Sequence, residues 1–246
     1  MIYITGDIHG SIDIHKLTAK SMKEREAEGG YVPDFKEGDY LIICGDFGLM
    51  WSHEGEKYYK EEQYWLSWLE ERPFTTLFID GNHENFDILD ELPVTEWNGG
   101  KVHMIRERII HLMRGQVYNI EGMTFFTMGG ASSHDKEYRT EGKSWWSREL
   151  PSSEEYEEAV KNLAACQNTV DYIITHCAPL SIQRELEMNY AEDELVRFLE
   201  TEVMRKVRYK VWFNGHYHID ADLDRNIILY DEIVPVDFKE RKKEDI

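Results

Sequence analysis

The chain has 246 residues, of which 41% are hydrophobic, and its 48 acidic and 28 basic residues give a formal net charge of -20. This length and apolar content suffice for one large domain or two small ones with a sizeable core. The charge argues against a protein that coats long nucleic acids, because a polyanion is repelled unless a local basic patch or bound metal reverses the field.

The cysteines and the apolar stretches indicate a reducing compartment without a membrane span. Cys44, Cys166 and Cys177 lie beside apolar residues and show no CxxC spacing, a pattern that favours reduced core thiols over disulfides. No stretch approaches the roughly 18 uncharged apolar residues of a spanning helix, and the N-terminal residues show no export signal. We therefore expect a cytoplasmic protein that does not contact the membrane. Its oligomeric state is left open.

Strand-like and helix-like segments alternate in the first third of the chain. Ile2–Thr5 is apolar and ends at Gly6, which predicts a strand, and 11–28 predicts a helix capped by Ser11. The same alternation continues with a strand at 40–44, a helix at 57–71 and a strand at 75–79. Repeated strand, turn and helix units predict a buried sheet.

The pattern of predicted elements changes after residue 100. Short β-type segments within 102–128, broken by Gly115 and Gly122, predict antiparallel hairpins and hence a mixed sheet system. We then expect helices at 153–166 and 191–206 and strands at 171–175, 210–214, 219–223 and 226–229. No linker or repeat divides the chain, so we predict one layered α/β domain over 1–238, with an irregular insertion at about 131–152 and a charged C-terminal tail at 239–246.

Five short segments concentrate the chemistry. Each is an apolar strand followed by a glycine-containing turn rich in Asp, Asn or His: GDIHG at 6–10, GDFG at 45–48, GNHEN at 81–85, THCAP at 175–179 and GHYH at 215–218. The carboxyl ends of parallel strands open onto a common edge, so these turns can converge although they are distant in sequence.

Two of these turns carry donor pairs at i and i+2. In a nearly extended backbone, the two side chains of each pair would point to one side of the chain. The pairs are Asp7 with His9 and His216 with His218. Four of the turns have a glycine beside a candidate donor, which permits tight turns and close backbone approach: Gly6, Gly45, Gly81 and Gly215.

Imidazole nitrogen mixed with carboxylate and amide oxygen suits manganese, iron or zinc better than calcium or magnesium. Two divalent ions, with Asp7, Asp46 and a bridging hydroxide, leave about one net positive charge, which attracts an anionic phosphate. A single histidine beside a strand is more often structural than a ligand. Five such segments in one order outweigh that alternative.

In these motifs the sequence resembles the calcineurin-like metallophosphoesterase superfamily over nearly its whole length. The resemblance implies two packed mixed β-sheets flanked by helices, a four-layer sandwich, with a centre of two divalent metal ions. It further implies that one ion takes Asp7, His9 and His218, that the other takes Asn82, His176 and His216, and that Asp46 bridges both. His83 is left unligated, as the catalytic residue that protonates the leaving oxygen or stabilises the phosphoryl charge.

One departure from the superfamily pattern bears on subclass. Its Ser/Thr protein phosphatases carry an Asp three positions after the bridging Asp and an Arg four positions after it, where this chain has Leu49 and Met50. Their carboxylate orients the catalytic histidine and their arginine holds phosphate. The sequence therefore argues against that subclass, and another group must bind phosphate.

The insertion offers a candidate for that group. It gathers four basic residues and two tryptophans in an acidic chain: Lys136, Arg139, Lys143, Arg148, Trp145 and Trp146. This composition suits a lid over a nucleotide-like substrate, with Arg139 as the substrate-binding residue. The alternative, which we favour for the insertion as a whole, is a solvated loop pinned to the body by its tryptophans.

The leading hypothesis is a manganese-dependent enzyme, with iron or zinc as alternatives, that hydrolyses a small phosphate monoester or diester by metal-activated hydroxide. A nuclease acting on short nucleic acid would need an electropositive groove, against which the net charge argues. A silent metal-binding scaffold usually lacks the motif histidine that His83 represents. His103 and His111 receive no role, since surface or hairpin positions explain them.

Overall fold

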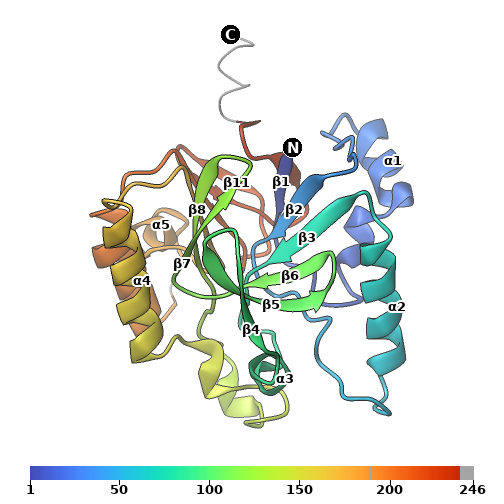
Figure 1. The fold of residues 1–246 in the computed structure, drawn as a ribbon, viewed down its shortest axis with the longest axis horizontal. Coiled ribbons are helices and arrows are strands. Elements are labelled where there is room, and N and C mark those ends of the chain that lie inside the picture. The colour runs from blue at the N-terminus through green and yellow to red at the C-terminus, as the bar shows by residue number, and fades with distance from the viewer. Residues whose placement is uncertain (189, 239–246) are drawn as a thin grey trace.

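The computed structural model describes residues 1–188 and 190–238, and Figure 1 shows two β-sheets side by side with helices on their outer faces. The first sheet has the order β13-β1-β2-β3-β6-β5-β4. Its strands are β1 (Ile2–Thr5), β2 (Asp39–Ile43), β3 (Phe74–Phe78), β4 (Val94–Trp97), β5 (Gly100–Arg106), β6 (Ile109–Leu112) and β13 (Ile233–Pro235). Parallel pairing joins β1, β2, β3 and β6, and the remaining pairs are antiparallel.

The second sheet has the order β11-β12-β10-β9-β8-β7. It contains β7 (Gln116–Ile120), β8 (Met123–Met128), β9 (Tyr172–Thr175), β10 (Val211–Asn214), β11 (Ala221–Leu223) and β12 (Asn226–Ile228). Here β8, β9, β10 and β12 are parallel, whereas β7 and β11 pair antiparallel at the two edges. Both sheets are therefore mixed, which confirms the predicted fold class.

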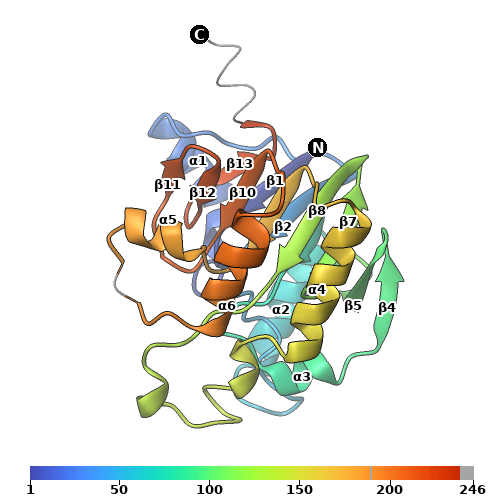
Figure 2. The ribbon, with the colours of Figure 1, turned by 90° about the vertical axis from the view of Figure 1, so that its left-hand side faces the viewer.

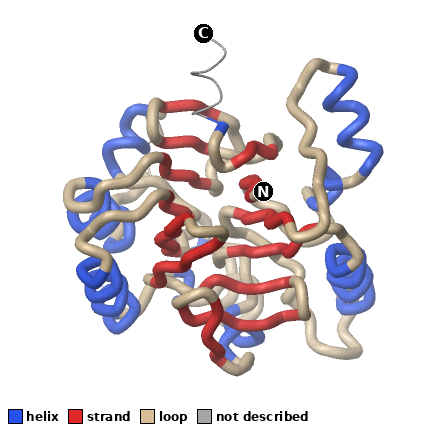
Figure 3. The backbone as a smooth tube through the Cα atoms, turned by 45° about the horizontal axis from the view of Figure 1, so that its top comes forward, coloured by secondary structure: helices blue, strands red, loops and turns tan. Residues whose placement is uncertain are grey.

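The helices and sheets form four layers, and Figure 3 shows the strands between two groups of helices. Three apolar clusters hold these layers together. The cluster between the sheets includes Ile4, Phe125 and Phe213, all fully buried. A second packs α2 (Tyr59–Glu70) on the first sheet, and a third packs α4 (Ser153–Ala165) and α6 (Glu194–Phe198) on the other. Figure 2 shows α4 and α6 across the outer face of the second sheet.

Several predicted boundaries need correction. The helix expected at 11–28 is a 3-10 turn, Ile14–Leu17, followed by α1 (Ala19–Ala27), and its cap is Thr18, whose Oγ1 accepts from Ser21 N at 3.4 Å. The helix expected at 191–206 begins at Glu194 and continues as a π-helix over Leu199–Met204. Elements not predicted are β4, β13, α3 (Phe86–Asp90) and α5 (Leu180–Glu185).

The insertion at 131–152 forms two 3-10 turns, Lys136–Tyr138 and Ser147–Glu149. Within residues 1–188 and 190–238, every helix is too short or too polar to cross a bilayer. The charged tail expected at 239–246 lies outside the described residues.

Candidate metal centre

The predicted donors follow the carboxyl ends of parallel strands in both sheets. In the first sheet the motif turns follow β1, β2 and β3, and in the second they follow β9 and β10. Because the sheets pack face to face, these ends meet, and they bring together all eight motif residues: Asp7, His9, Asp46, Asn82, His83, His176, His216 and His218. The expected convergence of remote turns is present.

The buried carboxylate of Asp46 lies between donors from both sheets. Its Oδ2 lies 3.2 Å from His9 Nε2, and its Oδ1 lies 3.3 Å from His176 Nε2. The same Oδ1 accepts a hydrogen bond from the backbone N–H of His83 at 2.7 Å. A carboxylate between two imidazoles in this way has the position expected of a bridging ligand.

Asp7 is the second buried carboxylate. One of its oxygens lies 3.4 Å from His218 Nε2, and both accept from the backbone N–H of His216, at 3.0 and 3.1 Å. The donor atoms of Asp7, His9 and His218 lie within 4.8 Å of one another, and so do those of Asp7, Asp46 and His176. A third set, His9, Asp46 and His83, is equally compact, so both carboxylates belong to more than one set that is close enough to hold a cation.

The amide and the remaining imidazole complete the cluster on the His176 side. Asn82 Oδ1 lies 3.2 Å from His176 Nε2, and the rings of His176 and His216 have centroids 4.9 Å apart. His176 Nδ1 contacts the carbonyl of Cys44 at 2.7 Å, which fixes the orientation of the ring. Ring orientation by a backbone carbonyl is common among metal-binding histidines.

The close approach depends on glycine. A Cβ on Gly81 would overlap the Asp46 carboxylate, and one on Gly215 would overlap the Asp7 carboxylate. The expectation of extended backbone is wrong, because His216 and His218 have φ of 73° and 51°. They do not face one spot: the ring of His216 packs on His176, whereas His218 reaches Asp7.

The site concentrates negative charge, as a cation-binding site requires. Burial opposes ionisation of Asp46, but His176 and His9 outweigh it and hold the pKa of Asp46 well below its usual range. Burial likewise disfavours a charged imidazole, yet the two carboxylates raise the pKa of His176 to about 10 and that of His9 to about 9. Protons therefore compensate the charge of the two carboxylates, and a divalent cation would compensate the same charge if it displaced those protons.

A family model described as calcineurin-like phosphoesterase matches residues 1–220. The chain belongs to the calcineurin-like phosphoesterase family. Lariat debranching enzyme A of Xenopus laevis is 22% identical over 243 residues, which covers 89% of this chain and 42% of that protein. Lariat debranching enzyme of Schizosaccharomyces pombe is 30% identical over 115 residues, 46% of this chain and 23% of that protein. The chain spans less than half the length of these curated relatives.

Among solved structures, a putative 5'-nucleotidase from Staphylococcus aureus matches with a TM-score of 0.45 and 16% identity, over 93% of this chain and 48% of that one. Because this family consists of phosphoesterases, the chain belongs to a family of hydrolases.

The structure also shows the surroundings of Leu49, the residue that stands where Ser/Thr protein phosphatases carry an Asp. Leu49 is fully buried in the apolar cluster beneath α2.

The insertion supplies the group that contacts the family's motif histidine. Arg139 Nη1 lies 3.1 Å from His83 Nδ1, and Arg139 Nε pairs with Asp135 at 2.8 Å. Trp146 is 4% exposed and packs edge to face on Trp51, with centroids 5.3 Å apart. The insertion is thus pinned by a tryptophan, as the favoured alternative predicted, while it also presents Arg139 at the candidate site.

A second layer of contacts, which sequence reasoning missed, supports the donors. Asn82 Nδ2 donates to Ser133 Oγ at 3.1 Å, and that hydroxyl donates to Glu149 Oε1 at 2.9 Å. His9 Nδ1 contacts Asp13 Oδ2 at 2.7 Å. The i, i+4 spacing of Asp13 from His9 was a usable signal, whereas nothing in the sequence marks Ser133 as a neighbour of Asn82.

Two other histidines lie in a hairpin and not at the surface. His103 and His111 pair with each other across β5 and β6, so the hairpin alternative is confirmed. They are 4% and 5% exposed, so the surface alternative is wrong, and their Nδ1 atoms lie 3.2 Å apart. His111 Nε2 contacts Asp80 Oδ1 at 3.2 Å, and Asp80 Oδ2 accepts from Arg114 Nε at 2.8 Å. These four residues form a buried polar network directly before the GNHEN turn.

Three hollows adjoin the donors. One of ≈ 160 Å³ is walled by Asp46, His83 and Arg139. A second of ≈ 200 Å³ shares His216 with it, and a third of ≈ 300 Å³ shares His83 and is lined by Trp51. The second and third hollows have no lining residue in common.

Proposed function

We propose that this chain is a dinuclear metal-dependent phosphoesterase that hydrolyses a phosphate monoester or diester in the cytoplasm. The observation that carries the proposal is the buried Asp46 carboxylate, 3.2 Å from His9 and 3.3 Å from His176, in a cluster of donors from both sheets. The three free cysteines agree with a reducing compartment.

The donor set supports two sites that share one carboxylate. Asp7, His9 and His218 would hold one ion, and Asn82, His176 and His216 the other, with Asp46 between them. We expect manganese, with iron or zinc as alternatives, since each of these metals accepts ligands from a mixed set of nitrogen and oxygen donors. When bound, such ions supply positive charge for the phosphoryl oxygens and lower the pKa of the attacking water.

His83 and Arg139 would act on the substrate itself. A guanidinium only donates hydrogen bonds, so its contact with His83 Nδ1 makes that nitrogen an acceptor and leaves the proton of the neutral ring on Nε2. His83 Nε2 is then the donor available to the leaving oxygen or to a phosphoryl oxygen. Arg139, held by Asp135, is placed to bind a second phosphoryl oxygen.

The two separate side hollows favour a diester over a monoester, because a diester carries two organic substituents and a monoester only one. The comparison of bis(p-nitrophenyl) phosphate with p-nitrophenyl phosphate, in the presence of manganese, iron or zinc, tests this choice. We expect faster turnover of the diester and about two ions per chain by elemental analysis. Metal binding without turnover of any ester would favour the silent scaffold instead.

A nuclease acting on short nucleic acid is the second candidate within the same chemistry. The net charge of -20 argues against binding along an extended strand. Oligonucleotides of increasing length discriminate the two, since a small-ester enzyme loses efficiency as the strand grows and a nuclease does not.

The first mutational test concerns His83. His83→Ala should retain both metal ions and the melting temperature while kcat falls by about a hundredfold or more, the usual scale for loss of a positioned proton donor. His53→Ala is the matched control, because this histidine is exposed and lines none of the three hollows. Unchanged turnover in His83→Ala removes that residue from the mechanism.

A further inference from the structure

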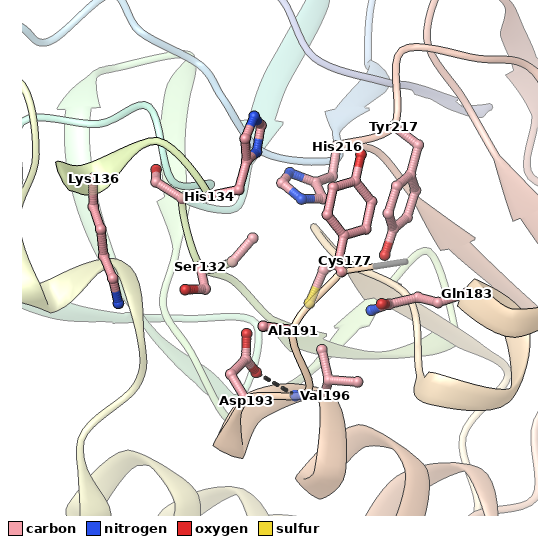
Figure 4. Close-up of a pocket in the computed structure, with 13 residues that line it drawn as sticks. Ser132, His134, Lys136, Cys177, Gln183, Ala191, Asp193, Val196, His216 and Tyr217 are labelled. Carbon is pink, nitrogen blue, oxygen red and sulfur yellow. Dashed lines mark hydrogen bonds between the residues drawn. The ribbon is translucent and has the colours of Figure 1, made fainter. Parts of the chain in front are cut away.

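The hollow of ≈ 200 Å³ lies beside the candidate metal centre, and Figure 4 shows the candidate donor His216 among the residues that line it. It shares Ser133, His134, Tyr190, His216 and Tyr217 with the hollow that contains Asp46 and His83. A substrate whose phosphate lies at the donors would therefore project a substituent into this space. We call it the side cavity.

Aromatic faces dominate one side of the side cavity. The ring centroids of Tyr190 and Tyr217 are 6.0 Å apart at 35°, and Tyr190 is also 6.0 Å from His134 at 36°. Tyr217 is fixed, since it is 7% exposed and its hydroxyl accepts from the backbone N–H of Ala178 at 2.9 Å. Tyr190 is 44% exposed, and its ring also lies 6.1 Å from that of His216.

Polar groups occupy the other side. Gln183 is 4% exposed, and its Nε2 donates to the carbonyl of Ala178 at 2.9 Å. Asp193 accepts from Val196 N with one oxygen, as Figure 4 shows, and Lys136 completes the wall. A buried amide, a carboxylate and an ammonium beside aromatic rings offer both donors and acceptors to the edge of a planar ring.

We infer that the side cavity binds a planar heteroaromatic ring of the nucleobase type, carried by a substrate whose phosphate lies at the metal centre. This inference rests on the proposed function, since it assigns the substituent of the same ester. Stacking on the tyrosine face serves any base, and the polar wall selects among bases. A lipid chain does not suit these polar groups, because they would lose water without gaining partners.

The size of the side cavity limits the substrate to a single ring system. Its ≈ 200 Å³ lies below the roughly 300–1,000 Å³ of sites for drug-sized ligands. One nucleoside fits this scale and a run of nucleotides does not. The acidic charge of the chain points the same way, because it disfavours a longer polyanion.

The binding test uses metal-free protein and free nucleosides, so it does not depend on turnover. Isothermal titration with adenosine, cytidine and ribose should show nucleoside binding and no ribose binding. Tyr190→Ala should weaken nucleoside binding roughly five- to 150-fold, the range expected for loss of one base-stacking contact, and Tyr190→Phe should retain it. Tyr138→Ala is the control, because Tyr138 is 91% exposed and lines none of the three hollows described above.

The kinetic test compares bis(p-nitrophenyl) phosphate with a nucleoside p-nitrophenyl phosphodiester. In Tyr190→Ala, the ratio of kcat/KM for the nucleoside ester to that for the aryl ester should fall at least fivefold. Turnover of aryl esters without nucleoside binding overturns this inference and leaves the proposed function standing. If the protein binds nucleosides but its metal-loaded form turns over no ester, the ring site stands and the proposed function fails. Ribose bound as tightly as adenosine also overturns the inference.

Discussion

The buried ion pair between Asp80 and Arg114 gives the sharpest stability prediction. Arg114 Nη2 lies 2.6 Å from Asp80 Oδ2, and the two side chains are 2% and 3% exposed. The same guanidinium donates to the carbonyls of Arg148 at 2.8 Å and Glu149 at 3.3 Å. It therefore ties the strand end that precedes the GNHEN turn to the end of the insertion.

Arg114→Met keeps much of the side-chain volume but leaves the Asp80 carboxylate buried without its cation. Burial disfavours this charge, and Arg114 outweighs the burial to hold the pKa of Asp80 below its usual range. Removing one partner of such a pair costs about 3–5 kcal/mol. At about 2–4 °C per kcal/mol for a chain of this size, the melting temperature should fall by roughly 6–20 °C.

The assay is thermal unfolding of metal-free protein at pH 7, with Arg205→Met as the control. The Arg205 side chain is 67% exposed and pairs with Glu200 at 3.5 Å, so its loss should cost no more than about 1 kcal/mol. A drop in Arg114→Met no larger than in the control would refute the reasoning. Asp80→Asn added to Arg114→Met should recover part of the loss, since it removes the orphaned charge; no recovery would show that charge is not the cause.

Three further perturbations address the site and its support. Asp46→Asn should lower the metal content from about two ions per chain to one or fewer, measured by elemental analysis after dialysis, and retention of both would exclude Asp46 as the bridge. Ser133→Ala removes the acceptor of the Asn82 amide and should weaken metal affinity about 10–100-fold by titration calorimetry, with Ser147→Ala unchanged. Burial raises the pKa of Glu149 to about 7, so the folded state favours its protonated form. This contribution is full below about pH 4.5 and is lost as pH rises through 7. The melting temperature of wild type relative to Glu149→Gln should thus fall between pH 5 and pH 8, and a constant difference would contradict this.

The sequence predicted most strands of the sheets to within a residue or two, because apolar runs that end in glycine mark both their type and their end. β4 escaped prediction because it is an edge strand whose side chains are largely exposed, so it has no apolar face to detect. The helix expected at 11–28 failed for another reason. Ile14 and Lys16 are buried, and the Lys16 ammonium donates to the carbonyl of Asp7 at 2.7 Å, a contact that a 3-10 turn positions.

The convergence of the candidate donors could be predicted because residue type and order mark the motif turns. The contacts that support these donors could not be predicted, since each depends on a long-range approach. Ser133 lies 51 residues from Asn82, and Arg139 lies 56 residues from His83. An alternating strand pattern likewise shows that His111 has a preferred face but not whether that face meets the core.

The backbone of the motif turns explains why the donors form a cluster in the protein itself. Asp46 and His9 adopt φ of 47° and 40°, a region that costs most residues about 1–3 kcal/mol and that Asp and His tolerate better than most. The conformation is held by hydrogen bonds between the two turns, from His9 N to Asp46 O at 2.8 Å and from Gly10 N to Phe47 O at 2.9 Å. The closeness of Gly10 to the Gly48 carbonyl leaves no room for a Cβ. Backbone pairing between turns therefore sets the spacing of His9 and Asp46, so the fold itself preorganises these two candidate ligands.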